Sequence, residues 1–272
     1  MSDLFSLKNR VAIVTGALGL LGKQHCFALA EAGANVVVTD LNGEDCEAFA
    51  HELGTATSTQ PIGIGADITQ RVSVEVLRDR VYQSRRGIDI LVNNAAVNDA
   101  FENPAAAAEQ SKFENYPLEL WQQSLDVNIT GTFLCSQVIG GTMASQGRGS
   151  IINIASTYGI VGPDQSLYSM PDGRQSYYKT PSYPTTKGAV IAFTRFLATY
   201  WAGNGVRVNA LSPGGVENGQ DKNFIEKYSM RTPLGRMAQP TDYKGALVFL
   251  ASDASSYMTG ANLVIDGGWT AW

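Results

Sequence analysis

A tyrosine and a lysine stand four residues apart in the segment Ser182-Tyr183-Pro184-Thr185-Thr186-Lys187, just before an apolar run at residues 189–193. Residues at this spacing share one face of a helix, so the two side chains would point the same way. A free phenol has a pKa of about 10, and a nearby cation lowers it by favouring the phenolate. The pair could therefore serve in general acid/base catalysis. Tyrosine and lysine at this spacing also occur on solvent-exposed helix faces, so a catalytic role needs support from other residues of the chain.

A glycine-rich turn follows a short β-branched run at residues 10–15. Such a run, apolar on both faces, predicts a buried parallel strand. The turn carries Gly16, Gly19 and Gly22 and leads into a helical pattern that stops at Gly33. Strand, glycine turn and helix form the context of a dinucleotide-binding turn, because glycine lets the backbone approach a pyrophosphate and the helix N-terminus offers free N–H groups. Glycine-rich turns also occur without ligands.

Asp40 ends the next predicted strand, at residues 35–39. An acidic residue about 20 positions past the glycines can accept hydrogen bonds from the adenosine ribose hydroxyls and would repel a 2′-phosphate. The flanking Leu41 and Asn42 supply no arginine to reverse that preference. We therefore predict NAD (NADH) in preference to NADP. The alternative is that Asp40 caps the helix starting near Glu44, a role that Asn42 could also fill.

Strands and helices alternate along the remaining chain. Further strands are predicted at residues 61–66, 88–92, 150–155, 206–211 and 262–266, and helices at 44–53, 72–81, 118–138, 183–201, 221–230 and 240–250. This pattern predicts an α/β fold, a Rossmann-type doubly wound parallel sheet of about seven strands. We expect a single dinucleotide-binding catalytic domain over residues 1–272, with insertions at about 98–117 and 163–181.

Polar residues follow several predicted strands. Asn93 and Asn94 end the fourth, Ser156 follows the fifth, and Pro213 and Gly214 follow the sixth. The carboxyl ends of parallel strands lie at one edge of a sheet, where ligands bind, so these residues should meet there. For Asn93 we favour a structural role that joins neighbouring strands.

Asn128 lies inside an apolar helical pattern. A buried amide in that position is costly unless it is hydrogen-bonded. From the residues alone, a satisfied core asparagine and a catalytic one are equally good interpretations.

Composition excludes several classes of function. The 272 residues carry a net charge of −5 and no basic patch, so we expect no nucleic acid partner. Cys26, Cys46 and Cys135 have no metal-ligand spacing, and we expect reduced, buried thiols in a cytoplasmic protein without a metal site. His25 and His51 are the only histidines and fall in helical stretches, which leaves little for a Ser-His-Asp triad. No signal peptide and no membrane span are predicted.

Taken together, these features resemble the short-chain dehydrogenase/reductase family over residues 7–268. The resemblance rests on Thr15-Gly16…Gly19…Gly22, Asp67, Asn93-Asn94-Ala95, Asn128, Ser156, Tyr183-x-x-x-Lys187, Pro213-Gly214 and Asp266-Gly267-Gly268. It implies an NAD(H)-dependent oxidoreductase that interconverts a secondary alcohol and a ketone by hydride transfer.

The resemblance also implies roles for individual residues. Tyr183 would be the general acid/base, and Lys187 would lower its pKa and hold the nicotinamide ribose. Ser156 would hydrogen-bond the substrate oxygen. Asn128 would fix a water that links Lys187 to solvent. The implied cofactor-binding residues are Gly16, Leu18, Gly19, Leu20, Leu21, Gly22, Asp40, Leu41, Asp67, Ile68, Asn94, Ala95, Ala96, Tyr183, Lys187, Pro213, Gly214 and Val216. The implied substrate-binding residues are Asn98, Ser156, Tyr158, Tyr168, Tyr177, Tyr178 and Gly215.

The chain departs from the family pattern in a few places. Leu20 and Ala96 replace usual glycines, and the stretch between Ser156 and Tyr183 is longer than usual. The extra residues, about 164–179, should lie over the substrate. Their tyrosines and Arg174 suit a polyhydroxylated or phosphorylated ligand, since arginine binds phosphate bidentately.

Finer assignments follow from the same resemblance. The insertion and the C-terminal sequence are similar to bacterial members that modify sugars for surface glycans, including flagellin modification. Alternatives are a reductase of apolar ketones or steroids, and an NAD-binding regulator without turnover. The resemblance further implies a homo-tetramer or homo-dimer, joined through the helices of Asn128 and Tyr183 and through the last strand. The aromatic tail at residues 269–272 would suit such an interface.

Overall fold

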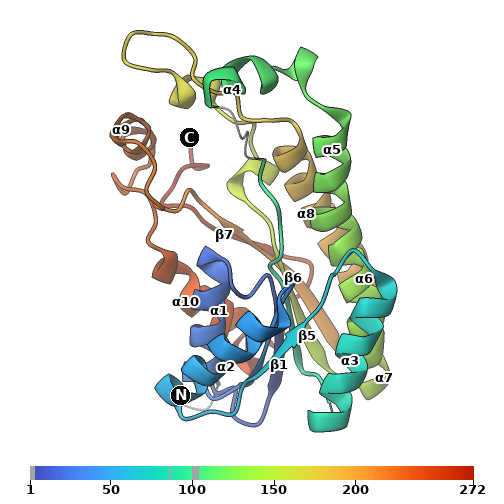
Figure 1. Ribbon diagram of the computed structural model, residues 1–272. Helices are drawn as coiled ribbons and strands as arrows, with labels where there is room; N and C mark the ends of the chain where they lie inside the picture. The colour runs from blue at the N-terminus through green and yellow to red at the C-terminus, as the bar shows by residue number, and fades with distance from the viewer. Residues whose placement is uncertain (1–3, 86, 100–103) are drawn as a thin grey trace.

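The computed structural model describes residues 4–85, 87–99 and 104–272 (Figure 1). At its centre is a parallel seven-stranded sheet of order β3-β2-β1-β4-β5-β6-β7. The strands are β1 (Val11–Thr15), β2 (Asn35–Asp40), β3 (Ile62–Gly65), β4 (Ile90–Asn93), β5 (Gly149–Ile154), β6 (Val206–Pro213) and β7 (Asn262–Ile265). The order reverses between β1 and β4, which opens a crevice at their carboxyl ends. The predicted Rossmann-type sheet is confirmed.

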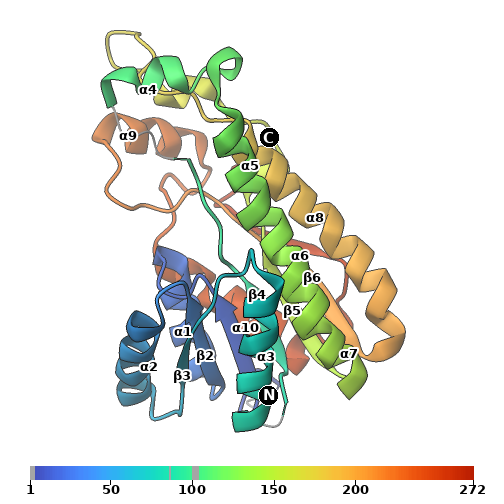
Figure 2. The same cartoon turned by 45° about the vertical axis from the view of Figure 1, so that its right-hand side comes forward.

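Helices cover both faces of the sheet (Figures 1 and 2). One face carries α1 (Leu20–Glu31), α2 (Gly43–Thr57) and α10 (Lys244–Ala251). The other carries α3 (Arg71–Arg85), a long helix at residues 118–146 and α8 (Ser182–Trp201). Because apolar side chains find a partner on either side, every residue of β1 is buried. Burial of each such aliphatic side chain stabilises the fold by about 1.5–3 kcal/mol.

The long helix contains two wider turns that the periodicity did not predict. It runs through α5 (Leu118–Leu125), α6 (Thr132–Cys135) and α7 (Gly141–Gln146), joined by π-helical segments Asp126–Gly131 and Ser136–Gly140. Such segments occur frequently at functional sites. Asn128 lies in the first of them.

The two insertions and α9 (Lys222–Arg231) lie above the carboxyl ends of the strands (Figure 2). The first insertion contains α4 (Pro104–Gln110) and a 3₁₀ turn, Phe113–Asn115; its residues 100–103 lie outside the described residues. The second contains a 3₁₀ turn, Gln165–Tyr168. Other 3₁₀ turns are Thr157–Gly159, Ala202–Asn204, Pro240–Tyr243 and Asp253–Ser255.

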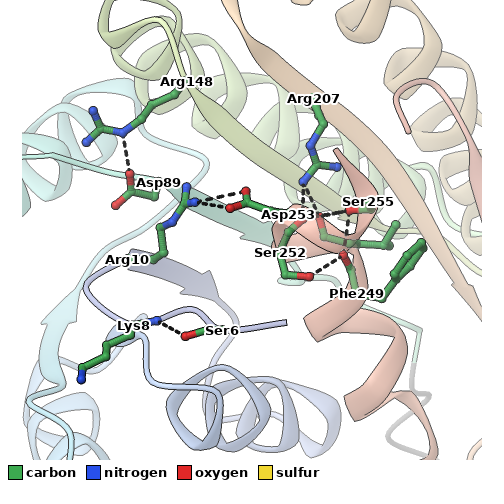
Figure 3. A network of polar contacts seen from close by, with 11 residues as sticks. Ser6, Lys8, Arg10, Asp89, Arg148, Arg207, Phe249, Ser252, Asp253 and Ser255 are labelled. Atoms are coloured by element: carbon green, nitrogen blue, oxygen red, sulfur yellow. Dashed lines mark hydrogen bonds and ion pairs between the residues drawn. The ribbon is translucent and has the colours of Figure 1, made fainter. Parts of the chain in front are cut away.

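Ion pairs close the opposite, amino-terminal edge of the sheet (Figure 3). Arg10 pairs with Asp253 at 3.0 Å, and Arg148 with the buried carboxylate of Asp89 at 2.9 Å. Asp89 also accepts a hydrogen bond from the Val11 N–H at 2.9 Å. These contacts tie the start of β1 to neighbouring segments, so this edge is occupied by structural polar groups.

Within the described part of the chain, no helix is long and apolar enough to cross a membrane. No group of histidine, cysteine or acidic side chains in that part could hold a metal ion. The three cysteines are buried and unbridged. Burial raises the pKa of the Cys46 thiol to about 11 and that of Cys135 to about 12, which leaves them unreactive.

Candidate active site

A continuous cleft runs along the carboxyl ends of the central strands. One half, about 500 Å³, lies between the glycine turn and the ends of β2 and β4. The other, about 350 Å³, lies at the ends of β5 and β6 beside the start of α8. The two halves share Leu21, Asn94, Ala96 and Val97, so one elongated ligand could occupy both. We call them the glycine-turn pocket and the Tyr183 pocket.

The glycine turn is shaped by close backbone contacts. Gly16 has φ +61°, and a Cβ there would lie 2.6 Å from Cα of Ala95. A Cβ on Gly22 would lie 2.1 Å from the Gly16 carbonyl oxygen. Only glycine fits at either position. The Asn94 amide holds the turn by donating to the carbonyls of Thr15 at 3.0 Å and Gly16 at 2.9 Å.

Asp40 faces the glycine-turn pocket from the end of β2. Its carboxylate accepts from the N–H groups of Leu18 at 3.0 Å and Leu41 at 2.9 Å. Asn42 caps α2 by accepting from two N–H groups of its first turn, so the alternative of Asp40 as the cap is wrong. None of the described residues lining this pocket is a lysine or arginine.

Most of the implied cofactor-binding residues line the cleft. The glycine-turn pocket is lined by Gly16, Gly19, Leu20, Leu21, Gly22, Asp40, Leu41, Asp67, Ile68, Asn94, Ala95 and Ala96. The Tyr183 pocket is lined by Tyr183, Lys187, Pro213, Gly214 and Val216. Leu18 lies behind the first pocket, where its N–H fixes Asp40.

Tyr183 and Lys187 reach the same pocket from the first turns of α8, as their spacing predicts, and Ser156 meets them from the end of β5. The Lys187 ammonium donates to the Ile154 carbonyl at 2.7 Å and lies 5.7 Å from the centroid of the Tyr183 ring. Burial lowers the pKa of Lys187 to about 8 because the charged ammonium loses hydration.

The pKa of Tyr183 shifts in the opposite direction to the one expected from Lys187. Burial raises it, because the phenolate loses hydration, and a hydrogen bond with Ser156 only partly opposes the shift. The expected lowering by Lys187 is therefore wrong for the protein by itself. Burial is the main cause, and the Lys187 ammonium donates to the Ile154 carbonyl instead of to the phenol oxygen.

Asn128 is fully hydrogen-bonded and lines neither pocket. Its Oδ1 accepts from the Val97 N–H at 2.8 Å, and its Nδ2 donates to the Val97 carbonyl at 3.0 Å and to Thr186 Oγ1 at 3.1 Å. The amide thus joins the long helix to the segment after β4 and to α8. It aligns the Tyr183 helix with the segment that lines both pockets.

We expect Asn128→Ala to destabilise the protein by about 1–3 kcal/mol, because the buried Thr186 hydroxyl and the half-buried backbone groups of Val97 lose a partner. Urea unfolding measures this. The control is Asn115→Ala, because Asn115 is exposed and its amide donates to Glu109 within the first insertion. Equal unfolding midpoints for both variants would contradict the role assigned to Asn128.

Lys179 is a site residue that sequence reasoning missed. Its ammonium lies 4.4 Å from the centroid of the Tyr183 ring and donates to the Asn98 amide oxygen. The side chain lines the Tyr183 pocket and the residue is only 9% exposed. Burial lowers its pKa to about 8, and the charge of Asp99 partly opposes that shift. Its place in an aperiodic insertion, before α8 begins at Ser182, left no sequence signal for the direction of its side chain.

Five of the seven implied substrate-binding residues line the Tyr183 pocket: Asn98, Ser156, Tyr158, Tyr168 and Gly215. Tyr177 and Tyr178 do not. The ring of Tyr177 packs behind Tyr168, with centroids 5.3 Å apart, and the Tyr178 N–H donates to Ser111 Oγ at 2.9 Å. These contacts turn both residues toward the insertions.

Arg174 also lies outside the pocket, against expectation. It pairs with Asp172 at 2.7 Å on an exposed loop, and its side chain is 75% exposed. A carboxylate two residues away satisfies the guanidinium locally, so nothing draws it to the cleft.

Asp99 anchors the second insertion to the start of α8. Its carboxylate accepts from Tyr116 OH at 2.7 Å, Ser182 Oγ at 2.8 Å and Thr180 Oγ1, while Ser124 Oγ donates at 3.2 Å. Four hydroxyls from three segments therefore meet one half-buried carboxylate. This network sets the positions of the residues on either side of it, Lys179 and Tyr183.

The chain is similar to known proteins along its whole length. A family model described as Enoyl-(Acyl carrier protein) reductase, of the short-chain dehydrogenase/reductase family, matches residues 16–270. D-threitol dehydrogenase of Mycolicibacterium smegmatis is 35% identical, over 98% of this chain and 95% of its own. NAD-dependent glycerol dehydrogenase of Listeria innocua is 31% identical, over 98% and 96%.

Solved structures agree. Gluconate 5-dehydrogenase from Burkholderia cenocepacia, in complex with NADP and tartrate, superposes with a TM-score of 0.87 at 30% identity, covering 100% of this chain and 99% of its own. The family assignment rests on three findings: the parallel sheet with a glycine turn at its switch point, the cleft that reaches Tyr183, and the relatives of matching length. The chain belongs to the short-chain dehydrogenase/reductase family and is an oxidoreductase that acts on CH–OH groups.

Proposed function

We propose that the chain is an NAD(H)-dependent dehydrogenase that interconverts a secondary alcohol and a ketone on a polyol or sugar-derived substrate. The observation that carries this proposal is the meeting of Tyr183, Ser156 and Lys187 in one pocket that continues into the glycine-turn pocket. The glycine-turn pocket would hold NAD+, which would supply the hydride acceptor for the reaction.

The protein's own groups handle the proton and the charge. Tyr183 takes the hydroxyl proton as the carbonyl forms, and it returns the proton in the reverse direction. Ser156 hydrogen-bonds the substrate oxygen and stabilises its developing charge. The Lys187 ammonium, which lines the same pocket, would hold the nicotinamide ribose. Whether Asn128 fixes a relay water stays a prediction.

The preference for NAD rests on Asp40. Its carboxylate lines the glycine-turn pocket, whose described lining includes no lysine or arginine, and it would face the 2′-phosphate of NADP. The relatives use either cofactor: the Listeria enzyme is NAD-dependent and the Burkholderia structure holds NADP. The cofactor must therefore be argued from this chain's own residues.

A polyhydroxylated substrate is supported by the lining of the Tyr183 pocket. Two lysines, the hydroxyls of Tyr158 and Tyr168, and the amide of Asn98 face it. The relatives include enzymes named for threitol and glycerol, and the Burkholderia structure holds tartrate. An apolar ketone or steroid would leave these groups unpaired. A role in surface-glycan sugar chemistry is supported by the long second insertion and by the C-terminal sequence alone.

Initial rates of NAD+ and NADP+ reduction across polyols, sugar acids and simple alcohols test the proposal. We expect NAD+ reduction with at least one polyhydroxylated substrate and little with monofunctional alcohols. An absence of turnover across the panel, with NADH bound, would favour a regulator without catalysis. A preference for steroid ketones would favour the apolar alternative.

We further propose a single domain that works as a homo-oligomer in the cytoplasm. Exposed aromatic side chains of Phe133, Phe196 and Tyr200 line the outer face of the long helix and α8, with Phe196 stacked on Tyr200 at 5.8 Å. Such a face suits a helix-to-helix dimer interface. Of the aromatic tail, Trp269 is buried on Tyr228 within the chain at 4.2 Å, and Trp272 is exposed. Sedimentation as a monomer would contradict this proposal.

A further inference from the structure

The Tyr183 pocket holds an excess of positive charge. Lys179 and Lys187 both line it, and no aspartate or glutamate is among its described lining residues. An NAD-dependent alcohol dehydrogenation needs one lysine beside the tyrosine. The second lysine comes from the insertion, so its presence calls for a separate explanation.

The Lys179 ammonium is buried and has no ion-pair partner among the residues that the structure describes. Its contacts are the neutral amide oxygen of Asn98 and the face of the Tyr183 ring. Asp99 is close enough to raise its pKa, but the carboxylate oxygens of Asp99 are hydrogen-bonded to hydroxyls. A buried charge without a counter-ion is costly, and a ligand that supplies the counter-ion recovers that cost.

The position of the ammonium defines where such a counter-ion would lie. Nζ sits over the ring of the proposed general base, and its partner Asn98 lines the same pocket. An anionic group there would be close to the carbon that is oxidised. Because Lys179 is only 9% exposed, solvent screens its charge less than at the surface, and the attraction to an anion is stronger.

We propose that Lys179 is a specificity-determining residue that binds an anionic group of the substrate, a carboxylate or a phosphate, with Asn98 beside it. The preferred substrates are then acidic sugar derivatives, aldonates or sugar phosphates, rather than neutral polyols. This inference rests on the proposed function of the same pocket and leaves the proton and hydride steps unchanged.

Lys179→Met and Lys179→Arg test the proposal on matched substrates. Lys222→Met, at an exposed lysine on α9, is the control. Each variant and the wild-type protein are assayed with NAD+ on aldonates, the corresponding alditols and their phosphates. We expect Lys179→Met to lose about 30-fold or more in kcat/KM on the acidic substrates, through KM, because a desolvated charge partner is removed. Neutral alditols should change by only a few-fold, and Lys179→Arg should retain part of the preference for acids. The aldonate and phosphate arms identify the source of the anion.

A binding measurement separates this proposal from the one it rests on. Calorimetry of the NADH-loaded protein with D-gluconate and neutral D-gluconamide needs no turnover. The inference is supported if the wild-type protein binds the acid more tightly than the amide and Lys179→Met loses this difference. This result would hold even if no substrate were oxidised, and only the proposed function would then fail. Equal binding of acid and amide, or an equal loss by Lys179→Met on acidic and neutral substrates, overturns it. Melting temperatures and NADH affinity confirm that the variants fold.

Discussion

Replacement of Tyr183 by phenylalanine lowers kcat by about 10²- to 10⁴-fold, the range that a positioned general acid/base contributes. The dissociation constant for NADH should stay within a few-fold, because the substitution removes one oxygen and keeps the ring. The cation contacts of Lys179 and Lys187 are made to that ring, at 4.4 and 5.7 Å from its centroid, so both should survive. Steady-state kinetics and NADH fluorescence titration measure the two quantities.

The matched control is Tyr257→Phe, because Tyr257 is fully exposed and lines neither the glycine-turn pocket nor the Tyr183 pocket. It should keep the wild-type rate. Turnover by Tyr183→Phe at the rate of this control would show that another group moves the proton. A parallel loss of NADH affinity would instead indicate that the substitution disturbs the cleft.

The sheet and the polar ends of its strands were predictable because each strand is a short apolar run closed by a polar or glycine residue. All seven predicted strands are present, and Asn93 joins β4 to β5 by donating to Asn153 Oδ1 at 2.8 Å, as favoured. Parallel strands place such residues at one edge. That rule brings Ser156 and Tyr183 together although they are far apart in the chain.

The side-chain directions in the insertions were not predictable in the same way, because these segments lack a periodicity from which the inward-facing residues could be identified. Arg174 and Lys179 stand five residues apart in one insertion. Their charge alone does not indicate which of the two side chains enters the Tyr183 pocket. A local carboxylate keeps Arg174 in solvent, while the Asp99 network after Lys179 turns that lysine into the pocket. The π-helical turn around Asn128 was hidden for a related reason, since a single wide turn hardly alters the apolar pattern of a long helix.

The pKa of Tyr183 shows a further limit of sequence reasoning. The spacing of Tyr183 and Lys187 identifies two groups on one face, but the direction of the shift depends on hydration. Burial acts on both groups against their charged forms and leaves the phenol harder to ionise and the ammonium easier to deprotonate. A substrate hydroxyl hydrogen-bonded to Tyr183 and Ser156 would enter this balance during the reaction.

Asp40→Asn should change the cofactor preference by about 100-fold in the ratio of kcat/KM for NAD+ to that for NADP+. Two unit charges about 5 Å apart repel by roughly 3 kcal/mol at an effective dielectric of 20, which corresponds to a factor of about 100. The amide oxygen of asparagine can still accept from the Leu18 N–H, so the turn should remain intact. Asp45→Asn, an exposed acid in the first turn of α2, is the control and should leave the ratio unchanged.

Adding Leu41→Arg to Asp40→Asn should shift the cofactor preference further toward NADP+. Leu41 is 73% exposed at the rim of the glycine-turn pocket, where a guanidinium could bind the 2′-phosphate bidentately. Activity with NAD+ should fall only modestly, because the ribose loses one charged acceptor. If the wild-type protein already reduces NADP+ as efficiently as NAD+, the Asp40 carboxylate does not face the 2′-position and the cofactor prediction is wrong. If the double variant stays specific for NAD+, discrimination lies elsewhere along the cleft, and the lining at Asp67 and Ile68 becomes the next place to look.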